Sequence, residues 1–188
     1  REAERQEHEH TEIFPLLLFS LFGMLLFAAA NDLLTLFVAL EIFSLPLYLL
    51  CGMARRRRWL SQEAALKYFL LGAFSSAFFL FGVALLYGYA ASFSYAGGAQ
   101  AIVEDQAPRV LLLAGLVMVA VGLLFKVGAV PFHAWTPDVY TGAPTPVTGF
   151  MAIATKTAAV AALLRVFYVA LGGARWDWQP VIAAVAVA

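Results

Sequence analysis

The sequence contains little charge and almost no cysteine. Only 13% of its 188 residues are charged, and 12 lysine and arginine residues balance 12 aspartate and glutamate residues. A chain without a basic excess offers no electrostatic reason to bind nucleic acid. The lone Cys51 cannot form an internal disulfide, and no cysteine or histidine cluster has the spacing of a metal, haem or iron–sulfur site. We therefore expect no metal and no cofactor in this chain, so that any redox chemistry belongs to another subunit.

Apolar residues, in contrast, are abundant. They make up 63% of the chain, and the mean hydropathy is +0.83. Soluble domains are about half apolar and about a quarter charged, so this composition indicates an integral membrane protein. A bilayer core about 30 Å thick is crossed by about 20 apolar helical residues. By that measure we predict five full spans, at residues 13–30, 33–54, 63–91, 109 to the proline cluster at 131, and 146–171, and the start of a sixth.

The predicted fold is all-α: a polytopic transmembrane helical bundle with a broken helix near Pro131. Residues 1–12 are expected to form a charged cytoplasmic segment, residues 13–171 to hold the five transmembrane helices, and residues 172–188 to form an interfacial loop and the start of a further helix. The chain has no initiator methionine and stops inside the apolar run PVIAAVAVA. We therefore expect a fragment of a longer polypeptide.

Local signals refine these boundaries. Asn31 and Asp32 predict a tight turn with a helix N-cap, because short polar side chains accept hydrogen bonds from the first free backbone N–H groups. Ser61 is placed to cap the third span, and a polar, glycine-rich loop is expected around Glu104 and Asp105.

The distribution of basic residues predicts the orientation. Arg55 to Arg58 place the loop between the second and third spans in the cytoplasm by the positive-inside rule. The acidic loop near Glu104 then faces outward, and the HAWTPDVY connection and the N-terminal segment face inward.

Residues 125–156, FKVGAVPFHAWTPDVYTGAPTPVTGFMAIATK, combine apolar flanks with polar content. The segment holds two lysines, a histidine, an aspartate and four prolines. Hydrocarbon tolerates neither unpaired charge nor unsatisfied backbone, so such a segment must be buried in protein or lie beside a wet cavity. We interpret it as part of an ion pathway.

Glu41 and Lys126 are the first candidate site residues. Glu41 lies at mid-depth of its span, and Lys126 lies five residues before Pro131. Proline removes a helix hydrogen bond, so the helix is expected to break beside the lysine, as transporter helices break near ions. We expect a buried Glu41–Lys126 ion pair; the alternatives are a structural helix–helix hydrogen bond for Glu41 and a lysine that extends to the interface for Lys126.

Three further residues complete the candidate site. Lys156 lies about ten residues into its span, about 15 Å deep, which is the middle of the bilayer. His133 lies near the cytoplasmic surface, where it would either exchange protons with water or cap the broken helix. Lys67 lies in the first turns of its span, so an interfacial lysine is an equal alternative. Arg165 is a further ionisable residue along the last full span.

These groups predict proton transfer without a cofactor. Removal from water disfavours the charged form of a lysine, and a nearby carboxylate favours it. A change in the distance between Glu41 and Lys126 would therefore load or unload a proton, and the two groups would titrate as one coupled unit.

Three stretches carry a family resemblance: ALEIFSLPLYLL, QEAALKYFLLGAFSSAFFLFG and FKVGAVPFHAWTPDVYTGAPTPVTGFMAIATK. They resemble the antiporter-like membrane subunits of proton-translocating NADH-quinone oxidoreductase, respiratory complex I, over residues 33–166. The form WTPDVYTGAPTPV is similar to subunit N in particular. The resemblance implies helices four to eight of an inverted-repeat fold, so that the second repeat and the proton exit path would lie outside this chain.

The resemblance also assigns roles. It matches Glu41 to the glutamate of helix five, Lys67 to the additional lysine of helix six, Lys126 to the lysine of broken helix seven, His133 to the histidine after the break, and Lys156 to the lysine of helix eight. In the family these residues form the cytoplasmic half of a proton channel. The implied partners are the other membrane subunits of complex I, including antiporter-like paralogues, with flavin, iron–sulfur clusters and quinone held elsewhere.

We therefore expect a proton-translocating subunit of NADH-quinone oxidoreductase, driven by quinone reduction elsewhere in the complex. One alternative is a subunit of a multisubunit sodium/proton antiporter, which the same buried lysines would serve. Another is a scaffold whose charges are merely paired. The alanine- and arginine-rich composition favours a bacterial plasma membrane as the location.

Overall fold

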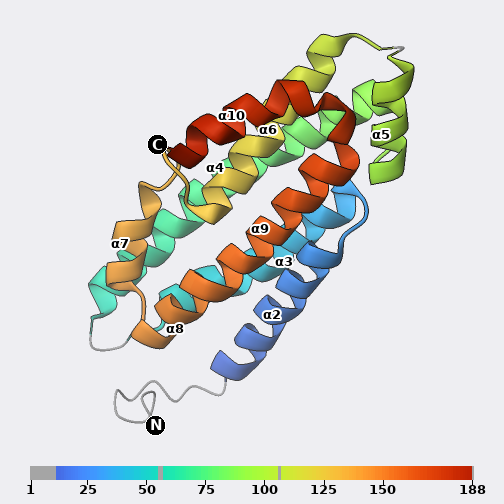
Figure 1. Ribbon diagram of the computed structural model, residues 1–188. Helices are drawn as coiled ribbons and strands as arrows, with labels where there is room; N and C mark the ends of the chain where they lie inside the picture. Colours follow the sequence, from blue (N-terminus) through green and yellow to red (C-terminus); the bar gives the residue numbers. More distant parts are fainter. Residues whose placement is uncertain (1–11, 55–56, 106, 188) are drawn as a thin grey trace.

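The computed structural model describes residues 12–54, 57–105 and 107–187, and within them the chain is helical (Figure 1). Besides helices and turns, these residues form one isolated β-bridge, between Asp32 and Ser94. The α-helices are α2 (Ile13–Ala29), α3 (Leu33–Cys51), α4 (Arg58–Ala90), α5 (Tyr95–Glu104), α6 (Arg109–Val127), α7 (Trp135–Gly142), α8 (Thr145–Phe150), α9 (Lys156–Arg165) and α10 (Arg175–Val187).

Five of these helices form a closed ring. In chain order α2 packs on α3, α3 on α4, α4 on α6 and α6 on α9, and α9 packs back on α2. Helix α8, a π-helical turn at Met151–Thr155, α9 and a second π-helical turn at Val166–Ala170 form one continuous helical run. Figure 1 shows the short helices α7 and α8 at one end of the bundle and α5 at the other. The predicted all-α bundle is confirmed.

The described helices agree closely with the predicted spans. Four are long and apolar enough to cross a membrane: α3, α4, α6 and the run from Thr145 to Ala170. The first predicted span is the 17-residue apolar helix α2, and the predicted sixth corresponds to α10. The division into three segments stays a prediction, and residues 1–11 of the first segment lie outside the described residues.

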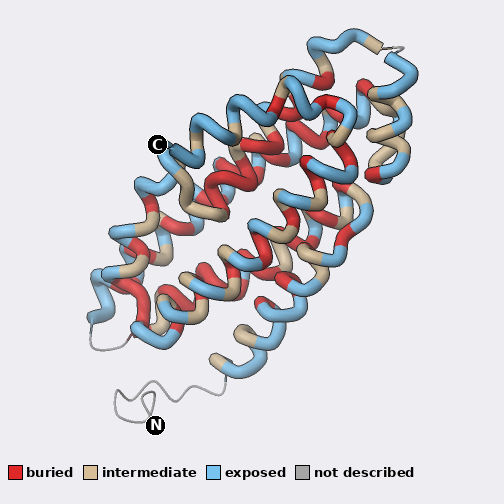
Figure 2. Tube along the Cα trace, in the orientation of Figure 1, coloured by how far each residue is buried: buried red, intermediate tan, exposed pale blue. Residues whose placement is uncertain are grey.

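Glycines bring α4 and α6 close together. A Cβ atom at Gly82 would stand 2.7 Å from the backbone nitrogen of Val119, and one at Gly122 would stand 2.7 Å from Cβ of Phe79. Small residues at helix contacts let backbones approach in membranes, where lipid supplies no hydrophobic drive for helix association. Figure 2 shows that buried residues line the inward faces, while exposed residues lie on the outside of the ring. Large apolar side chains such as Phe22, Leu49 and Phe74 are exposed on these outer faces, as a lipid-facing surface requires.

The link between α2 and α3 is held by polar contacts. Asp32 accepts a hydrogen bond from the backbone N–H of Thr35 at 2.7 Å, so the predicted N-cap is confirmed. Arg165 reaches over from the end of α9, donating from Nε to the carbonyl of Ala30 at 3.2 Å and from Nη2 to Oδ1 of Asn31 at 3.3 Å. Its guanidinium group is therefore bound by a helix-end carbonyl and a side-chain amide oxygen of the link.

Two local predictions are wrong. Ser61 is not an N-cap: α4 begins at Arg58, and buried Ser61 donates to the carbonyl of Cys51 at 2.5 Å and accepts from the N–H of Ala54 at 3.1 Å. The expected polar loop before Glu104 is instead helix α5, whose N-cap Ser94 accepts from the N–H of Gly97 at 3.0 Å. Arg55 and Arg56, which carried half of the orientation argument, lie outside the described residues.

Candidate functional site

Helix α6 ends inside the bundle near Pro131, as the sequence predicted: Val127 is its last residue and Gly128 is its C-cap. Gly128 adopts a positive φ of 75°, and its N–H donates to the carbonyls of Leu124 at 2.9 Å and Phe125 at 3.1 Å. The N–H of Ala129 also donates to Leu124 at 3.0 Å, which completes a glycine-terminated helix end. The chain resumes helical structure at Trp135, so the break separates α6 from α7 by seven residues, 128–134.

Lys126 lies in the last turn of α6, directly before this break, and is 3% exposed. Its Nζ donates a hydrogen bond to Oγ of Ser44 on α3 at 2.8 Å. The Ser44 hydroxyl in turn donates to the carbonyl of Leu40, so its lone pairs are left to face the lysine. In the described part of the chain, the buried amine of Lys126 thus has one hydrogen-bond acceptor, the hydroxyl of Ser44. This acceptor is neutral, whereas a protonated amine carries a full positive charge.

Glu41 and Lys126 do not form the expected direct ion pair. The described residues contain no nitrogen–oxygen contact within 4.0 Å between them, and buried Oε1 of Glu41 has no hydrogen-bond partner. Glu41 and Ser44 are three residues apart on α3, which places them on the same helix face. The hydroxyl of Ser44 therefore takes the position at Nζ that we had assigned to the carboxylate.

Trp135 fastens α7 to the end of α6. Its indole Nε1 donates to the carbonyl of Phe125 at 3.2 Å, and the two rings stack with centroids 5.4 Å apart. On its other side Trp135 stacks on Tyr68 of α4, at 4.9 Å with an interplanar angle of 11°. The residue before the buried lysine is thus anchored to the helix that follows the break.

Lys156 reaches the same break from α9. Its Nζ lies 3.4 Å from the point that a Cβ of Gly128 would occupy, and Oγ1 of Thr136 lies 3.3 Å from that point. Buried Oγ1 of Thr136 has no hydrogen-bond partner among the described residues. The side chain of Lys156 is partly buried, and α9 begins at this residue, directly after the π-helical turn. Such turns are frequent at functional positions in helices.

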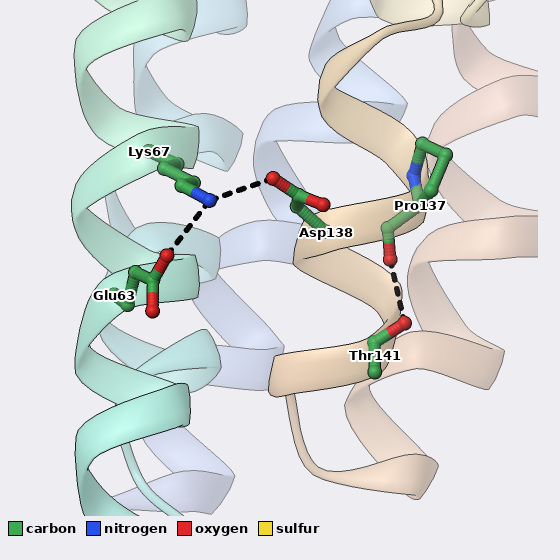
Figure 3. Close-up of polar contacts among 5 residues, drawn as sticks. All are labelled: Glu63, Lys67, Pro137, Asp138 and Thr141. Carbon is green, nitrogen blue, oxygen red and sulfur yellow. Dashed lines mark hydrogen bonds and ion pairs between the residues drawn. The ribbon is translucent and has the colours of Figure 1, made fainter.

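Lys67 has a different environment. It is 43% exposed and forms ion pairs with Glu63, one turn earlier on α4 at 2.8 Å, and with Asp138 of α7 at 2.7 Å (Figure 3). In Figure 3 both carboxylates point at the same Nζ from two different helices. Its charge is thus compensated at the edge of the bundle.

His133 is exposed in the segment between α6 and α7. Its carbonyl accepts from the N–H of Thr136 at 2.9 Å, which makes the residue part of the turn that starts α7. The structure therefore brings Lys126, Ser44 and Glu41 together in the interior, places Lys156 at the break, and leaves Lys67 and His133 toward the surface. The proton-transfer roles of these five predicted residues stay predictions.

Ser44, Thr136 and Asp138 were not selected as site residues from the sequence. Asp138 and Thr136 lie in the polar segment 125–156, so that segment offered a signal for them. The sequence signal for Ser44 is its position three residues after Glu41, since residues with this spacing lie on the same face of a helix. Nothing in the sequence paired it with Lys126, which is 82 residues away.

The chain is thus a bundle of apolar helices, long enough to cross a membrane, with a buried lysine beside a helix break, an arrangement that many membrane transporters share. The family model described as "NADH:quinone oxidoreductase/Mrp antiporter, TM" matches residues 30–188. The chain belongs to this family.

Individual relatives agree with this assignment. The chain is 68% identical over 187 residues to NADH-quinone oxidoreductase subunit N of Rhodococcus opacus, covering 100% of this chain and 35% of the relative. The chain is also 67% identical over 186 residues to NADH-quinone oxidoreductase subunit N of Cutibacterium acnes, covering 99% of this chain and 35% of the relative. The expected resemblance to subunit N is confirmed, and the chain spans about a third of the length of these relatives.

Solved structures share the fold. Respiratory complex I from Thermus thermophilus contains a chain with a TM-score of 0.73 and 47% identity, over 83% of this chain and 34% of that chain. The Mrp complex from Dietzia sp. DQ12-45-1b contains one with a TM-score of 0.74 and 25% identity, over 84% of this chain and 29% of that chain.

Proposed function

We propose that this chain is part of a proton-translocating membrane subunit of NADH-quinone oxidoreductase, and that it forms one half of a proton channel in the bacterial plasma membrane. The observation that carries the proposal is Lys126: a lysine that is 3% exposed, at a helix break, with a neutral hydroxyl at its Nζ. A lysine held without a fixed counter-charge is free to change its protonation state. The relatives named subunit N support the choice of complex.

The geometry suggests an order of events. With Glu41 out of contact, the proton on Lys126 is held only by Ser44 and by surrounding aromatic rings. Approach of Glu41 would favour the protonated lysine, and its withdrawal would release the proton toward Lys156 on the far side of the break. His133, exposed at the end of the bundle with α7, would reload the site from water.

The partners would be the other membrane subunits of the complex, including antiporter-like paralogues. Flavin, iron–sulfur clusters and quinone would be held by those partners. Quinone reduction in those partners would drive the movement of Glu41.

The test is NADH-driven proton pumping and NADH oxidation in membranes that carry Lys126→Ala or Lys156→Ala in the full-length subunit, with assembly checked on a native gel. We expect an assembled complex with pumping largely lost. A Lys126→Ala complex that pumps with the normal proton stoichiometry would overturn the proposal. If both variants fail to assemble, Lys126→Met and Lys156→Met, which keep the length of the side chain, replace them.

The second candidate is a subunit of a sodium/proton antiporter, which the likeness to the Mrp complex favours. The two functions differ in their energy source. Pumping that requires NADH oxidation and proceeds without sodium supports the first, and sodium-dependent proton exchange without NADH supports the second.

A further inference from the structure

Three aromatic rings surround the amine of Lys126. Nζ lies 5.4 Å from the ring centroid of Phe43, 5.7 Å from that of Tyr48 and 5.7 Å from that of Tyr68. All three distances fall within the roughly 6 Å over which a ring face attracts a cation. We call Phe43, Tyr48 and Tyr68 the aromatic cage.

The cage comes from two helices that pack on α6. Phe43 and Tyr48 belong to α3, Tyr68 belongs to α4, and all three side chains are buried. Tyr48 and Tyr68 contact each other edge to face, with centroids 4.7 Å apart. The rings are thus fixed by packing, so that their attraction for a cation costs no ordering when the lysine is charged.

The aromatic cage matters because the amine of Lys126 has no carboxylate in contact within the part of the chain that the structure describes. Glu41 does not reach Nζ, and Ser44 offers one neutral oxygen. Ring faces attract the charged amine and not the neutral one, and this attraction grows as water is removed. The cage therefore favours the protonated lysine in the state in which the carboxylate is withdrawn.

We propose that the aromatic cage is a second, carboxylate-independent means of keeping Lys126 protonated, and that Tyr68 is the positioning residue that joins it to the helix break. Tyr68 stacks on Trp135, which in turn bonds the carbonyl of Phe125, the residue before the lysine. A shift of α7 would therefore move a ring of the cage. The inference rests on the proposed function, because it concerns the proton that Lys126 would carry.

Other titratable groups also face this region from the packed helices. They are Glu41, Tyr48 and Cys51 on α3, Tyr68 on α4, Tyr140 on α7, and Lys156 on α9 near the break. Lys156 is the basic residue of this set, and a substitution at position 68 changes the identity of none of the other groups.

The experiment varies the ring at position 68 in the full-length subunit within the assembled complex. The variants are Tyr68→Phe, Tyr68→Leu, and Tyr68 replaced by phenylalanine with increasing fluorination, which keeps the size of the ring and weakens its attraction for cations. The measurement is NADH-driven pumping as a function of pH, with assembly checked on a native gel. Tyr89→Phe and Tyr89→Leu are matched controls, because Tyr89 is a buried tyrosine at the far end of the same helix.

We expect Tyr68→Phe to keep the wild-type profile. Tyr68→Leu should shift the alkaline midpoint of pumping to lower pH by about 0.5 to 1 unit, because a lysine without the ring loses its proton more easily. The fluorinated series should shift the midpoint step by step in the same direction, and the Tyr89 variants should not shift it.

Equal midpoints for phenylalanine, fluorinated phenylalanine and leucine would overturn the cage. If the leucine variant fails to assemble, the fluorinated series decides alone, because it changes the charge distribution of the ring and not its volume. Normal pumping in Lys126→Ala would overturn the proposed function as well. Lost pumping in Lys126→Ala with an unshifted fluorinated series would overturn only the cage.

Discussion

Lys126 and Lys67 show two ways of holding a lysine in one helical bundle. Lys67 lies at the edge, 43% exposed, between the carboxylates of Glu63 and Asp138. Lys126 lies inside, 3% exposed, with a hydroxyl and three aromatic rings around its amine. The first lysine is paired with charge and the second with polarisable but neutral groups.

We expect this difference to decide how readily each lysine exchanges its proton. Two fixed carboxylates stabilise the charged form of Lys67 strongly, so that its proton stays in place and its bond to Asp138 ties α7 to α4. Neutral neighbours leave Lys126 sensitive to the approach of one carboxylate. Helix propensity and hydropathy do not distinguish the two residues; their surroundings do.

The largest expected contrast comes from Lys126→Met and Lys67→Met. Lys126→Met should abolish pumping while the assembled complex stays at least as heat-stable as the wild type, because burial of an amine without a charged partner costs free energy that an apolar side chain does not. Lys67→Met should leave most pumping intact. The checks are pumping in vesicles and thermal inactivation of the purified complex. Equal loss of pumping in both variants would remove the distinction between the two sites.

The next effect concerns Ser44, which holds the amine of Lys126. Ser44→Ala leaves the buried amine without its acceptor, so we expect a loss of stability of about 1–3 kcal/mol and slower pumping. Ser20→Ala is the matched control, because Ser20 is also buried and its hydroxyl donates to the carbonyl of Phe43 at 3.3 Å without touching the lysine. Thermal inactivation and pumping rates should single out Ser44, and the same pumping rate in the two variants would argue against its role.

A smaller effect is expected at Trp135, the link between the break and α7. Trp135→Phe keeps an aromatic ring in the stack with Tyr68 and removes the bond from Nε1 to the carbonyl of Phe125, a loss of about 0.5–1.5 kcal/mol. Hydrogen exchange of the segment 128–142 should become faster, and Trp135→Leu should accelerate it further. Unchanged exchange in both variants would show that α7 is held by other contacts.

The smallest effect is expected at the exposed ion pairs. Asp138→Asn removes one carboxylate from Lys67 and leaves Glu63 in place, so pumping should change little. The remaining change should shrink as ionic strength rises, since exposed charges are screened over about 10 Å at 0.1 M salt. Pumping measured at low and high salt checks this. A loss as large as that of Lys126→Met would mean that the edge cluster carries protons.

Much of the fold could be predicted because membrane spans follow from length and apolarity alone. Four helices long enough to cross a membrane at predicted spans, the N-cap at Asp32 and a break after Lys126 are all present. The break lies near Pro131 as predicted, but the part played by glycine was not foreseen: Gly128 with its positive φ ends α6 before Pro131 is reached. Helix α5 was missed for a related reason, since Gly97 and Gly98 suggested a loop, although Ser94 was available as an N-cap.

The sequence predicted which residues belong to the candidate site, but not which of them contact one another. Buried charges stand out in an apolar sequence, so Glu41, Lys126 and Lys156 could be selected without a structure. The side chains that these residues contact depend on how α3 and α6 are rotated relative to each other. The local sequence does not determine this rotation. The same limit explains why the bond between Lys67 and Asp138, 71 residues apart, appeared only in the folded chain.

The order of the ring bears on how the protein is made. Because α3 and α4 precede α6 in the chain, the groups that receive Lys126 are synthesised and inserted before the lysine itself emerges. Insertion of a single charge at the centre of a bilayer costs about 2.5–3.5 kcal/mol. The Ser44 hydroxyl and the aromatic cage, which contact the amine of Lys126, belong to helices that are synthesised earlier. We therefore expect α3, which carries the acceptor Ser44, to insert before α6, which carries the donor Lys126. A circular permutant that begins at α6 would have to insert the helix with the buried lysine first.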